Sequence, residues 1–289
     1  MKTHLWQIGH GKSIDLDAPC IVAILNITPD SFADGGKLDS PQAAAERAEQ
    51  CVHEGASVLD IGGESTRPGA QRIGAQEQIK RVVPVIEHIR NCLPEIAISV
   101  DTTIAEVAMR AIEAGANIIN DVSAGEEDES MLRLSAETGS GLVLMHRLKQ
   151  PSNDSYSDAY AAPPHYSDVV GEVRAYLAGR LEAAVRAGVK PEAVVLDPGL
   201  GFGKDVEQNM ELIRRTAELC ELGAPVMSAA SRKSFVGRVS LGRQSEPSER
   251  LSGSVAVTVL HALAGARLFR VHDPAPHAES LRVLASINR

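Results

Sequence analysis

Short apolar runs recur along the chain, separated by stretches in which apolar residues follow a helical spacing. The runs are rich in Val, Ile and Leu and alternate with these helical stretches. Such a pattern is typical of parallel strands that are covered by helices. We predict eight strands, at 21–26, 57–61, 96–101, 117–121, 141–146, 193–197, 225–229 and 267–272.

The segments between the runs carry helix signals. The segments before 96–101 and before 193–197 each keep one apolar helical face. Ser40-Pro41 and Ser248 are typical helix starts. Six segments end at a glycine, where the residue after a helix takes a positive φ. These glycines are Gly55, Gly115, Gly139, Gly188, Gly223 and Gly265.

Alternating strands and helices predict an α/β fold. Eight such units favour a closed (β/α)8 TIM barrel over an open doubly wound sheet. We expect a single domain over 1–289, with the barrel core at about 20–289 and a short hairpin-like extension at 1–20 that covers the barrel. The stretch 147–167 is polar and has no apolar period, so we expect a loop there.

Composition and charge exclude several classes of protein. The chain has 29 Lys and Arg against 38 Asp and Glu, a formal net charge of −9, which disfavours nucleic-acid binding. No apolar stretch reaches the roughly 18 residues of a membrane span, and the amino terminus lacks a signal-peptide pattern. The four cysteines, Cys20, Cys51, Cys92 and Cys220, lie far apart, and we expect buried free thiols in a cytoplasmic protein.

Each apolar run stops at a polar residue. In a (β/α)8 barrel these positions converge on one face, where catalytic and binding groups lie. We therefore expect an active site built from the strand ends. They are Asn26, Asp60, Asp101, Asn120 with Asp121, His146, Asp197, Ser228 with Ser231, and Arg270 with His272.

The chemistry of these residues suggests two kinds of ligand group. Asp101, Asn120 and Asp197 would lie deep in the barrel, where buried carboxylates need donors or cations. Together they match the N–H and NH2 edge of a nitrogen heterocycle, and Lys233 could bond the opposite edge. The remaining mouth residues, Arg67, Arg270 and His272, suit a phosphate.

Other motifs in the sequence are weak. The segment Gly199–Lys204 lacks the spacing of a phosphate-binding loop, and no Cys/His cluster offers zinc ligands. Lys233 is expected to lie in a loop, which disfavours a Schiff base. We expect Asp205 to start a helix, Lys204 to be a surface charge, and His146 to be structural.

The motifs at the strand ends resemble those of the dihydropteroate synthase family. The two long motifs are NITPDSF at 26–32, followed by Asp34-Gly-Gly36, and DIGGESTRPG at 60–69. Shorter matches follow in the family's order, from Val100-Asp-Thr102 to Arg270-Val-His-Asp273. The resemblance covers roughly residues 20–273 and implies a pterin-binding barrel.

The resemblance also implies roles for individual residues. The implied pterin ligands are Asp101, Asn120, Asp197, Lys233, Met145 and Thr66, and Asp60 is implied on the pterin side or as an organiser of loops. The implied diphosphate ligands are Arg67, Arg270 and His272, and Asn26 would bind a Mg²⁺ cofactor. The implied p-aminobenzoate contacts are Ser231, Pro68, Phe202 and Lys233. Asp101, Lys233 and Arg67 are expected to be catalytic.

The implied reaction joins 6-hydroxymethyl-7,8-dihydropterin diphosphate to p-aminobenzoate, giving 7,8-dihydropteroate and diphosphate. The expected partners are these small molecules, with no nucleic acid or membrane, and the resemblance implies a homodimer. A related corrinoid methyltransferase would not need Arg67, the Ser231–Lys233 segment or Arg270. A noncatalytic pterin-binding relative would be indicated by the loss of Asn26, Lys233 or Arg270, and all three are present.

This sequence departs most from the family pattern after His146. Members usually continue there with a short Met-rich segment, whereas Arg147 opens a long polar loop to Ser167. We expect this loop to border the barrel mouth, where it could reshape substrate entry.

Overall fold

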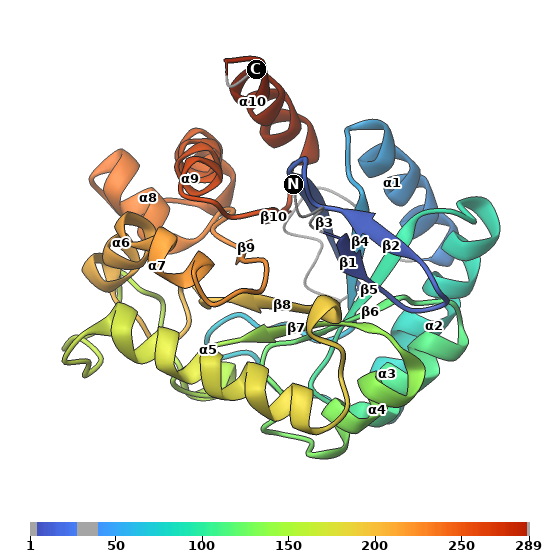
Figure 1. Ribbon diagram of the computed structural model, residues 1–289. Helices are drawn as coiled ribbons and strands as arrows, with labels where there is room; N and C mark the ends of the chain where they lie inside the picture. Colours follow the sequence, from blue (N-terminus) through green and yellow to red (C-terminus); the bar gives the residue numbers. More distant parts are fainter. Residues whose placement is uncertain (1–4, 28–39, 288–289) are drawn as a thin grey trace.

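The computed structural model describes residues 5–27 and 40–287 (Figure 1). Its main sheet has eight strands in the order β8-β7-β6-β5-β4-β3-β10-β9, with every neighbouring pair parallel. Each predicted run overlaps one of them, with bounds that differ by at most two residues. The strands are β3 (Cys20–Asn26), β4 (Val58–Gly62), β5 (Ala97–Asp101), β6 (Ile118–Asp121), β7 (Gly141–Met145), β8 (Val194–Asp197), β9 (Met227–Ser228) and β10 (Leu268–Val271).

Two junctions close this sheet into a barrel. The last strand, β10, pairs with the first, β3, so that Leu268 lies opposite Cys20. An isolated parallel bridge between Leu196 and Val226 connects β8 with the segment that leads into β9. The predicted strand 225–229 is reduced to two residues, and Pro225 at its start has no N–H to donate to a neighbouring strand. The predicted (β/α)8 barrel is confirmed.

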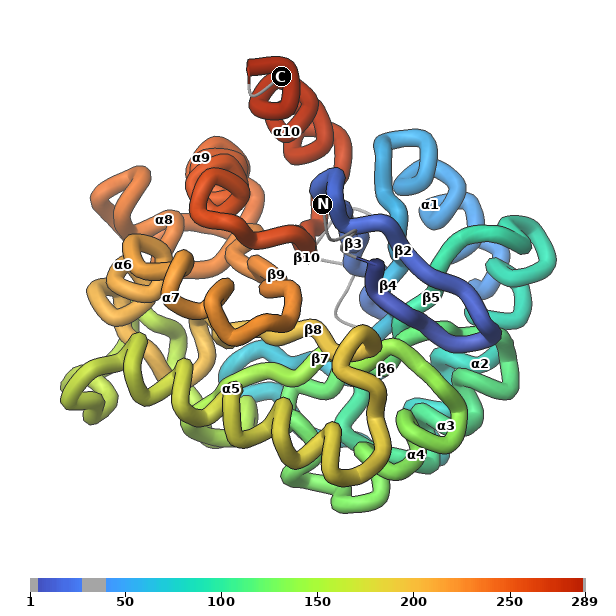
Figure 2. The backbone as a smooth tube through the Cα atoms, in the orientation of Figure 1, coloured from blue at the N-terminus to red at the C-terminus, as the bar shows by residue number. Residues whose placement is uncertain are grey.

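The helices surround the barrel (Figure 2). Ser40 begins α1, because its hydroxyl accepts the Ala43 N–H at 3.1 Å. The predicted start at Ser248 is wrong, since a 3-10 turn at Pro247–Arg250, capped by Glu246, precedes α9. The helices are α1 (Pro41–His53), α2 (Ala75–Cys92), α3 (Ala105–Glu113), α4 (Ser130–Thr138), α5 (Val169–Arg186), α6 (Val206–Arg214), α7 (Thr216–Cys220), α8 (Ser234–Leu241), α9 (Leu251–Leu263) and α10 (Pro274–Ile287).

The predicted helix-ending glycines all have a positive φ, as an αL position after a helix requires. None of the described helices is both long and apolar enough to cross a membrane. All four cysteines are free thiols. Cys92 is exposed, which corrects the expectation of burial, because it is the last residue of α2.

The predicted amino-terminal hairpin is present and closes the bottom of the barrel. Strands β1 (Leu5–Gln7) and β2 (Ser13–Asp15) pair antiparallel. Trp6 is 1% exposed and donates its indole N–H to the Ala193 carbonyl at 2.8 Å. Apolar side chains from all eight barrel strands pack under the hairpin, so this end of the barrel interior is apolar. They are Cys20, Val22, Val58, Ala97, Ile118, Val143, Val195, Met227 and Leu268.

The alternation of side chains along each strand separates this plug from the active-site end. In β4, Val58 belongs to the cluster under the hairpin, whereas Leu59 and Ile61 belong to the larger core cluster that includes helix residues. Asp60, two residues after Val58, therefore points into the barrel above the plug. The same strand thus contributes an apolar residue at the bottom and a carboxyl group higher up.

The loop 147–167 is ordered and contacts two other loops. Its Asp154 accepts the Gly203 N–H at 2.7 Å, and its Ser157 accepts a hydrogen bond from the Asn209 side chain at 3.1 Å. Its Pro151 carbonyl accepts the Gly69 N–H at 2.9 Å. The loop therefore spans part of the barrel mouth.

Candidate active site

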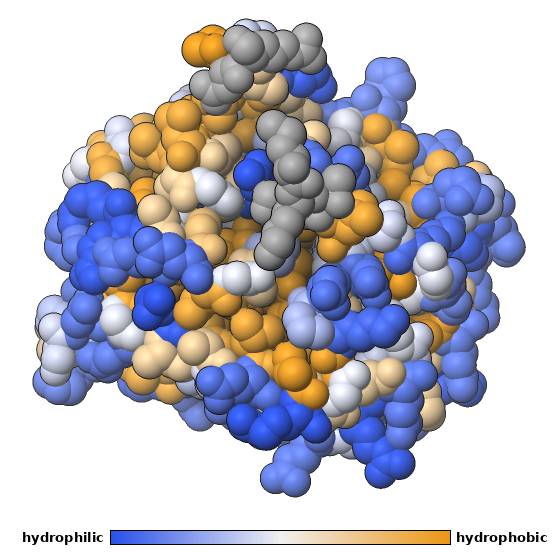
Figure 3. All heavy atoms as spheres, in the orientation of Figure 1, coloured by the Kyte–Doolittle hydropathy of each residue, from blue (hydrophilic) through white to orange (hydrophobic). Residues whose placement is uncertain are grey.

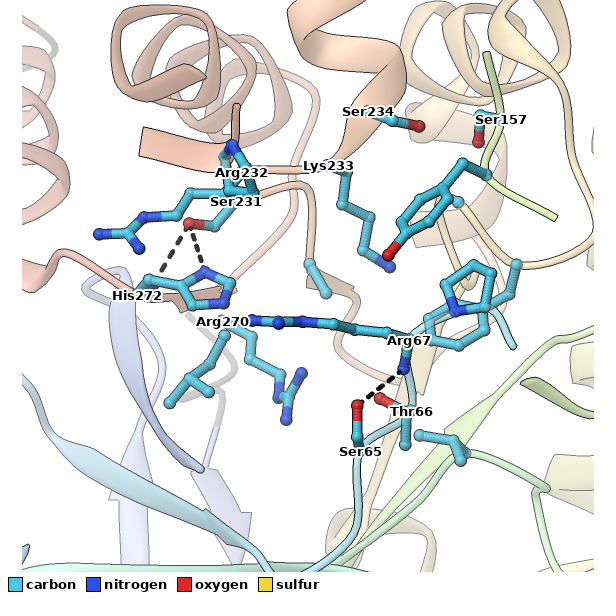
Figure 4. A pocket seen from close by; sticks show the side chains of 18 of the residues that line it. Ser65, Thr66, Arg67, Ser157, Ser231, Arg232, Lys233, Ser234, Arg270 and His272 are labelled. Carbon is cyan, nitrogen blue, oxygen red and sulfur yellow. Dashed lines mark hydrogen bonds between the residues drawn. The ribbon is translucent and has the colours of Figure 1, made fainter. Parts of the chain in front are cut away.

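A cavity of about 1290 Å³, open mouth included, lies at the carboxyl ends of the barrel strands. As predicted, residues from several strand ends converge there. The predicted strand-end residues Asp60, Asp101, Asp121, His146 and Ser228 do not line it. The predicted site residues that do are Asn26, Thr66, Arg67, Pro68, Asn120, Met145, Asp197, Phe202, Ser231, Lys233, Arg270 and His272. Figure 4 shows Lys233 and Arg67 reaching toward the middle of this cavity.

The cavity floor is a cluster of buried charges. Arg270 donates to Asp60 and to Asp101, at 2.6 Å in each case. The Asn120 amide donates to the same oxygen of Asp60 at 3.2 Å. The other Asp60 oxygen, Oδ1, is buried and has no hydrogen-bond partner among the described residues. Asp101 faces a second, smaller cavity beside Thr66.

Burial controls the ionisation of this floor. Burial raises the pKa of Asp101 to about 7, although the positive charge of Arg270 acts to lower it. Burial also raises the pKa of Asp197, against the effect of a hydrogen bond from the Gly199 N–H at 2.7 Å. These carboxyl groups are therefore prepared for a ligand that brings hydrogen-bond donors.

Lys233 and Phe202 form one wall of the cavity. The Lys233 ammonium donates to the Leu200 carbonyl and lies 4.1 Å from the centroid of the Phe202 ring, a cation–π contact. Burial lowers the pKa of Lys233 to about 7, while the negative charge of Asp197 acts to raise it. The wall thus presents both an amine and an aromatic face.

Ser231 and His272 lie at the end of the cavity away from Ser234 (Figure 4). The Ser231 hydroxyl accepts the His272 backbone N–H at 3.2 Å and lies 3.1 Å from the His272 Nδ1 atom. Burial, followed by the positive charge of Arg232, lowers the pKa of His272 well below its usual value. Arg232 itself forms a bidentate ion pair with Asp273, in which two guanidinium nitrogens donate to the two carboxylate oxygens at 2.9 and 2.7 Å.

Asn26 ends β3 and lines the cavity. It lies opposite Gly62, which lies opposite Asp101 on the next strand. A Cβ atom at Gly62 would be 3.4 Å from the Asn26 side-chain oxygen, so the glycine leaves that oxygen accessible. Within 5–27 and 40–287 no three His, Cys, Asp or Glu side chains converge as metal ligands. A cation at Asn26 would therefore need oxygen ligands from a substrate, an arrangement common for Mg²⁺.

A family model described as pterin binding enzyme matches residues 22–272 of the chain. The chain belongs to the pterin-binding enzymes. The family resemblance inferred from the motifs is confirmed. The part of the first motif beyond Ile27, with Asp34-Gly-Gly36, lies outside the described residues.

The relatives of this pterin-binding enzyme are dihydropteroate synthases. That of Escherichia coli strain K12 is 41% identical over 275 residues, which cover 95% of this chain and 93% of the relative. A structure of Xanthomonas albilineans dihydropteroate synthase with 4-aminobenzoic acid has a TM-score of 0.89 and 39% identity, with 99% of both chains covered. Another, in complex with 7,8-dihydropteroate, has a TM-score of 0.82 and 36% identity, with 96% of both chains covered.

Several cavity residues of this pterin-binding enzyme were missed by the sequence prediction. Tyr156 and Ser157 reach the cavity from the loop 147–167, and Ser234 begins α8. Arg250 is buried and donates to the backbone carbonyl of Arg232 at 2.8 Å. The position of Arg232 and Ser234 on either side of Lys233 was a usable signal, whereas nothing local marked Arg250.

Two loops at the mouth are tied together by charged side chains. Glu127 forms an ion pair with Arg72, of the 62–74 loop, at 2.7 Å. It also pairs with Arg147, at the start of the 147–167 loop. The side chains of Glu127 and Arg147 are 13% and 9% exposed. This arrangement couples two segments that both line the cavity.

The prediction that Lys204 is a surface charge is wrong. Its side chain is fully buried, and its ammonium lies 2.9 Å from the His146 Nδ1 atom. The error arose because the burial depends on packing with a residue 58 positions away. Asp205 does start α6, as predicted, through a capping box with Gln208. His146 has the structural environment that was expected, edge-on to Tyr176.

Proposed function

We propose that this chain is a dihydropteroate synthase. It is a transferase that forms a C–N bond between 6-hydroxymethyl-7,8-dihydropterin diphosphate and p-aminobenzoate, releasing diphosphate and 7,8-dihydropteroate in folate biosynthesis. One observation carries the proposal: a buried carboxyl and amide floor, a cationic rim and an aromatic wall meet in one cavity of a pterin-binding enzyme. The relatives, named for this activity, match over nearly the whole chain.

The floor suits the pterin ring. Carboxyl and amide groups complement the N–H and NH2 edge of the ring, and an apolar thioether packs well on its face. The proposed pterin residues are Asp101, Asn120, Asp197, Lys233, Met145 and Thr66. Because Arg270 holds Asp101 in an ion pair, the ring would compete with that guanidinium for the carboxylate.

The rim suits the diphosphate. Arg67, Arg270 and His272 are the proposed ligands, and His272 can donate or accept as a neutral imidazole. Asn26 would hold Mg²⁺ together with substrate oxygens. Bound Mg²⁺ would neutralise charge on the leaving diphosphate.

The wall suits p-aminobenzoate. The proposed contacts of its ring and carboxylate are Pro68, Phe202, Lys233 and Ser231. The geometry favours Ser234 over Ser231 for the carboxylate, because the Ser231 hydroxyl faces His272 whereas Ser234 lies at the start of α8, near Ser157 (Figure 4).

Asp101, Lys233 and Arg67 are the proposed catalytic residues. Departure of diphosphate leaves a methylene cation conjugated with the dihydropterin, which the Asp101 carboxylate would stabilise, while Arg67 takes up charge on the leaving group. The aniline nitrogen is already nucleophilic, so the site needs no strong general base. The coupled 62–74 and 147–167 loops would keep water from the cation. A second loop that we propose to close over the substrates, 27–38, lies outside the described residues apart from Ile27.

We also propose a cytoplasmic homodimer that binds neither nucleic acid nor membranes. Support for the dimer comes from exposed apolar side chains on the last two helices: Leu260 and Leu263 of α9 are 52% and 60% exposed, and Val283 of α10 is 61% exposed. Figure 3 shows hydrophobic side chains gathered over the α9 side of the molecule. The four free thiols support a reducing compartment.

One assay tests the activity. The purified protein is incubated with the dihydropterin diphosphate, p-aminobenzoate and Mg²⁺, and diphosphate release is measured. We expect release that depends on p-aminobenzoate and is inhibited competitively by a sulfonamide, a mimic of p-aminobenzoate. Release no faster than in the control without enzyme would refute the proposed function.

A further inference from the structure

Lys204 is a fully buried lysine for which the proposed mechanism has no use. Its ammonium has three hydrogen-bond partners: the Gly199 carbonyl at 3.0 Å, the Phe202 carbonyl at 2.9 Å and the His146 Nδ1 atom at 2.9 Å. An ammonium has three N–H donors, so these partners satisfy it completely. Burying a charged amine is unfavourable unless it is bonded in this way.

The two carbonyl partners belong to the same tight turn. Gly199, Gly201 and Gly203 all have a positive φ, at 65°, 80° and 64°. A Cβ atom on Gly199 would lie 1.8 Å from the His146 carbonyl oxygen, and one on Gly201 would lie 2.7 Å from Lys233. The turn is therefore packed tightly between β7 and the cavity lysine, and Lys204 bonds it from inside.

This turn carries both contacts of Lys233. The Leu200 carbonyl accepts the Lys233 ammonium, and the Phe202 ring lies 4.1 Å from it. Any shift of the turn would move the aromatic wall and the amine together. Lys204 does not line the cavity, and it forms no hydrogen bond with Lys233. It would therefore act through the turn.

His146 holds the other side of Lys204. Burial lowers the pKa of Lys204 to about 7, while the negative charge of Asp197 acts to raise it. In its protonated form Lys204 donates to the imidazole Nδ1 atom, and the neutral ring then carries its proton on Nε2. Burial, with the positive charge of Lys204, lowers the pKa of His146 to about 2, in agreement with a neutral ring. Tyr176 packs edge-on against the ring at 4.9 Å between centroids, which restrains its orientation.

We propose that Lys204, held by His146, is a positioning residue that fixes the Gly199–Phe202 turn and thereby shapes the p-aminobenzoate half of the site. The inference rests on the proposed function, because it assigns the Phe202 and Lys233 wall to p-aminobenzoate. The turn also bonds Asp197 and Lys233, which are assigned to the pterin as well. Phe202 is assigned to p-aminobenzoate alone, whereas the pterin residues Asp101 and Asn120 lie on other strands, so we expect the larger effect on p-aminobenzoate.

The test uses one substitution at Lys204 and two at His146. Lys204→Met removes the donors at similar length, and His146→Leu removes the acceptor. His146→Gln restores an acceptor, a side-chain carbonyl oxygen. Lys190→Met, at an exposed lysine outside the site, is the matched control.

In wild type and variants, KM is measured separately for each substrate. We expect Lys204→Met and His146→Leu to raise the KM for p-aminobenzoate about tenfold, an effect as large as the loss of one charged contact, and to raise that for the dihydropterin diphosphate by a clearly smaller factor. His146→Gln and Lys190→Met should stay within about twofold of wild type for both. An equal rise in the two KM values, or no rise, would overturn the proposal.

A second readout does not depend on turnover. The pKa of Lys233 is followed by NMR of its side-chain carbon next to the amine. In His146→Leu it should rise toward the ordinary value for lysine as the turn loosens, and in His146→Gln it should not. Lys204→Met does not enter this readout, because the charges of Lys204 and Lys233 repel each other and removing one raises the pKa of the other directly. An unchanged Lys233 pKa in His146→Leu would refute the positioning role even if the wild type had no synthase activity. Should Lys204→Met fail to fold, the His146 pair of variants decides both readouts.

Discussion

The two ends of the barrel interior are built in opposite ways from the same strands. At the bottom, Trp6 and the hairpin cover a layer of apolar side chains. At the top, Asp60, Asp101 and Arg270 form a buried ion cluster with an unsatisfied oxygen. Burying apolar area stabilises the fold, whereas burying charge at best offsets its own desolvation. Stability and chemistry are therefore expected to respond to different substitutions.

The largest effect is expected at the bottom, from Trp6→Ala. Removing a fully buried indole leaves a cavity and should lower the free energy of unfolding by about 3–5 kcal/mol. Urea unfolding measures this loss. Trp6→Phe, which loses the hydrogen bond to Ala193 and part of the ring volume, should cost about 2 kcal/mol. Neither variant should change kcat/KM by more than about twofold in the folded protein, and a large drop would show that the two ends are not separate.

At the top, Lys233→Ala and Arg270→Ala should each lower turnover by at least about tenfold, the loss of a charged contact worth roughly 1.5–3 kcal/mol. Lys233→Ala should leave the free energy of unfolding within about 1 kcal/mol of wild type, because it removes a buried charge that burial disfavours. Steady-state kinetics measure turnover, and urea unfolding of the same samples measures the free energy of unfolding. Wild-type turnover in both variants would mean that the site lies elsewhere.

One residue at the top, His146, makes a contribution to stability that is lost in acid, opposite in sign to that of Asp101, whose raised pKa favours the folded state as the pH falls. The pKa of His146 is lowered by burial, so the unfolded chain binds a proton below pH 6.5 that the folded chain does not. The stability contributed by the neutral ring is thus present above pH 6.5 and lost as the pH falls, by about 2 kcal/mol at pH 5. His146→Gln should flatten the decline between pH 7 and pH 5 in urea unfolding. In Trp6→Phe the free energy of unfolding should fall with pH as steeply as in the wild type. If Trp6→Phe flattened the decline as much as His146→Gln does, the decline could not be assigned to His146.

The smallest effect is expected from Glu127→Gln at the mouth. It weakens the pairs with Arg72 and Arg147 without changing side-chain shape. Gln keeps a side-chain oxygen that can accept hydrogen bonds from both arginines, so the KM for p-aminobenzoate should rise at most about fivefold. Glu137→Gln, in an exposed pair with Arg133, is the control for charge alone. Equal kinetics for the two variants would show that coupling the loops does not matter for binding.

The apolar runs were sufficient to predict the eight strands, because a buried parallel strand requires an apolar run wherever it lies in the barrel. The polar residues that end those runs also predicted the convergence of Asn120, Asp197 and Arg270 on one face. The prediction of a helix start at Ser248 failed because Glu246 caps a turn that begins before Ser248. The preference of serine for N-cap positions does not by itself decide which of two neighbouring residues caps the turn.

The missed features depend on contacts between distant segments. The burial of Lys204 requires His146, and the ion cluster at Arg270 requires Asp60, 210 residues away. No local spacing encodes such partners. The same reason explains why Arg250 was not predicted, since its role in bonding the Arg232 carbonyl appears only once the turn after β9 and the start of α9 are packed together.

The pairing of β10 with β3 has a consequence for the order in which the protein is completed during synthesis. The chain emerges amino end first, and the barrel cannot close until the residues of β10 have been made. Arg270 lies in that strand, so Asp60 and Asp101 are translated long before their cation. The charge balance of the floor is thus among the last properties that a newly made chain acquires, and a chain stopped before Leu268 would carry those carboxyl groups without the guanidinium that pairs with them.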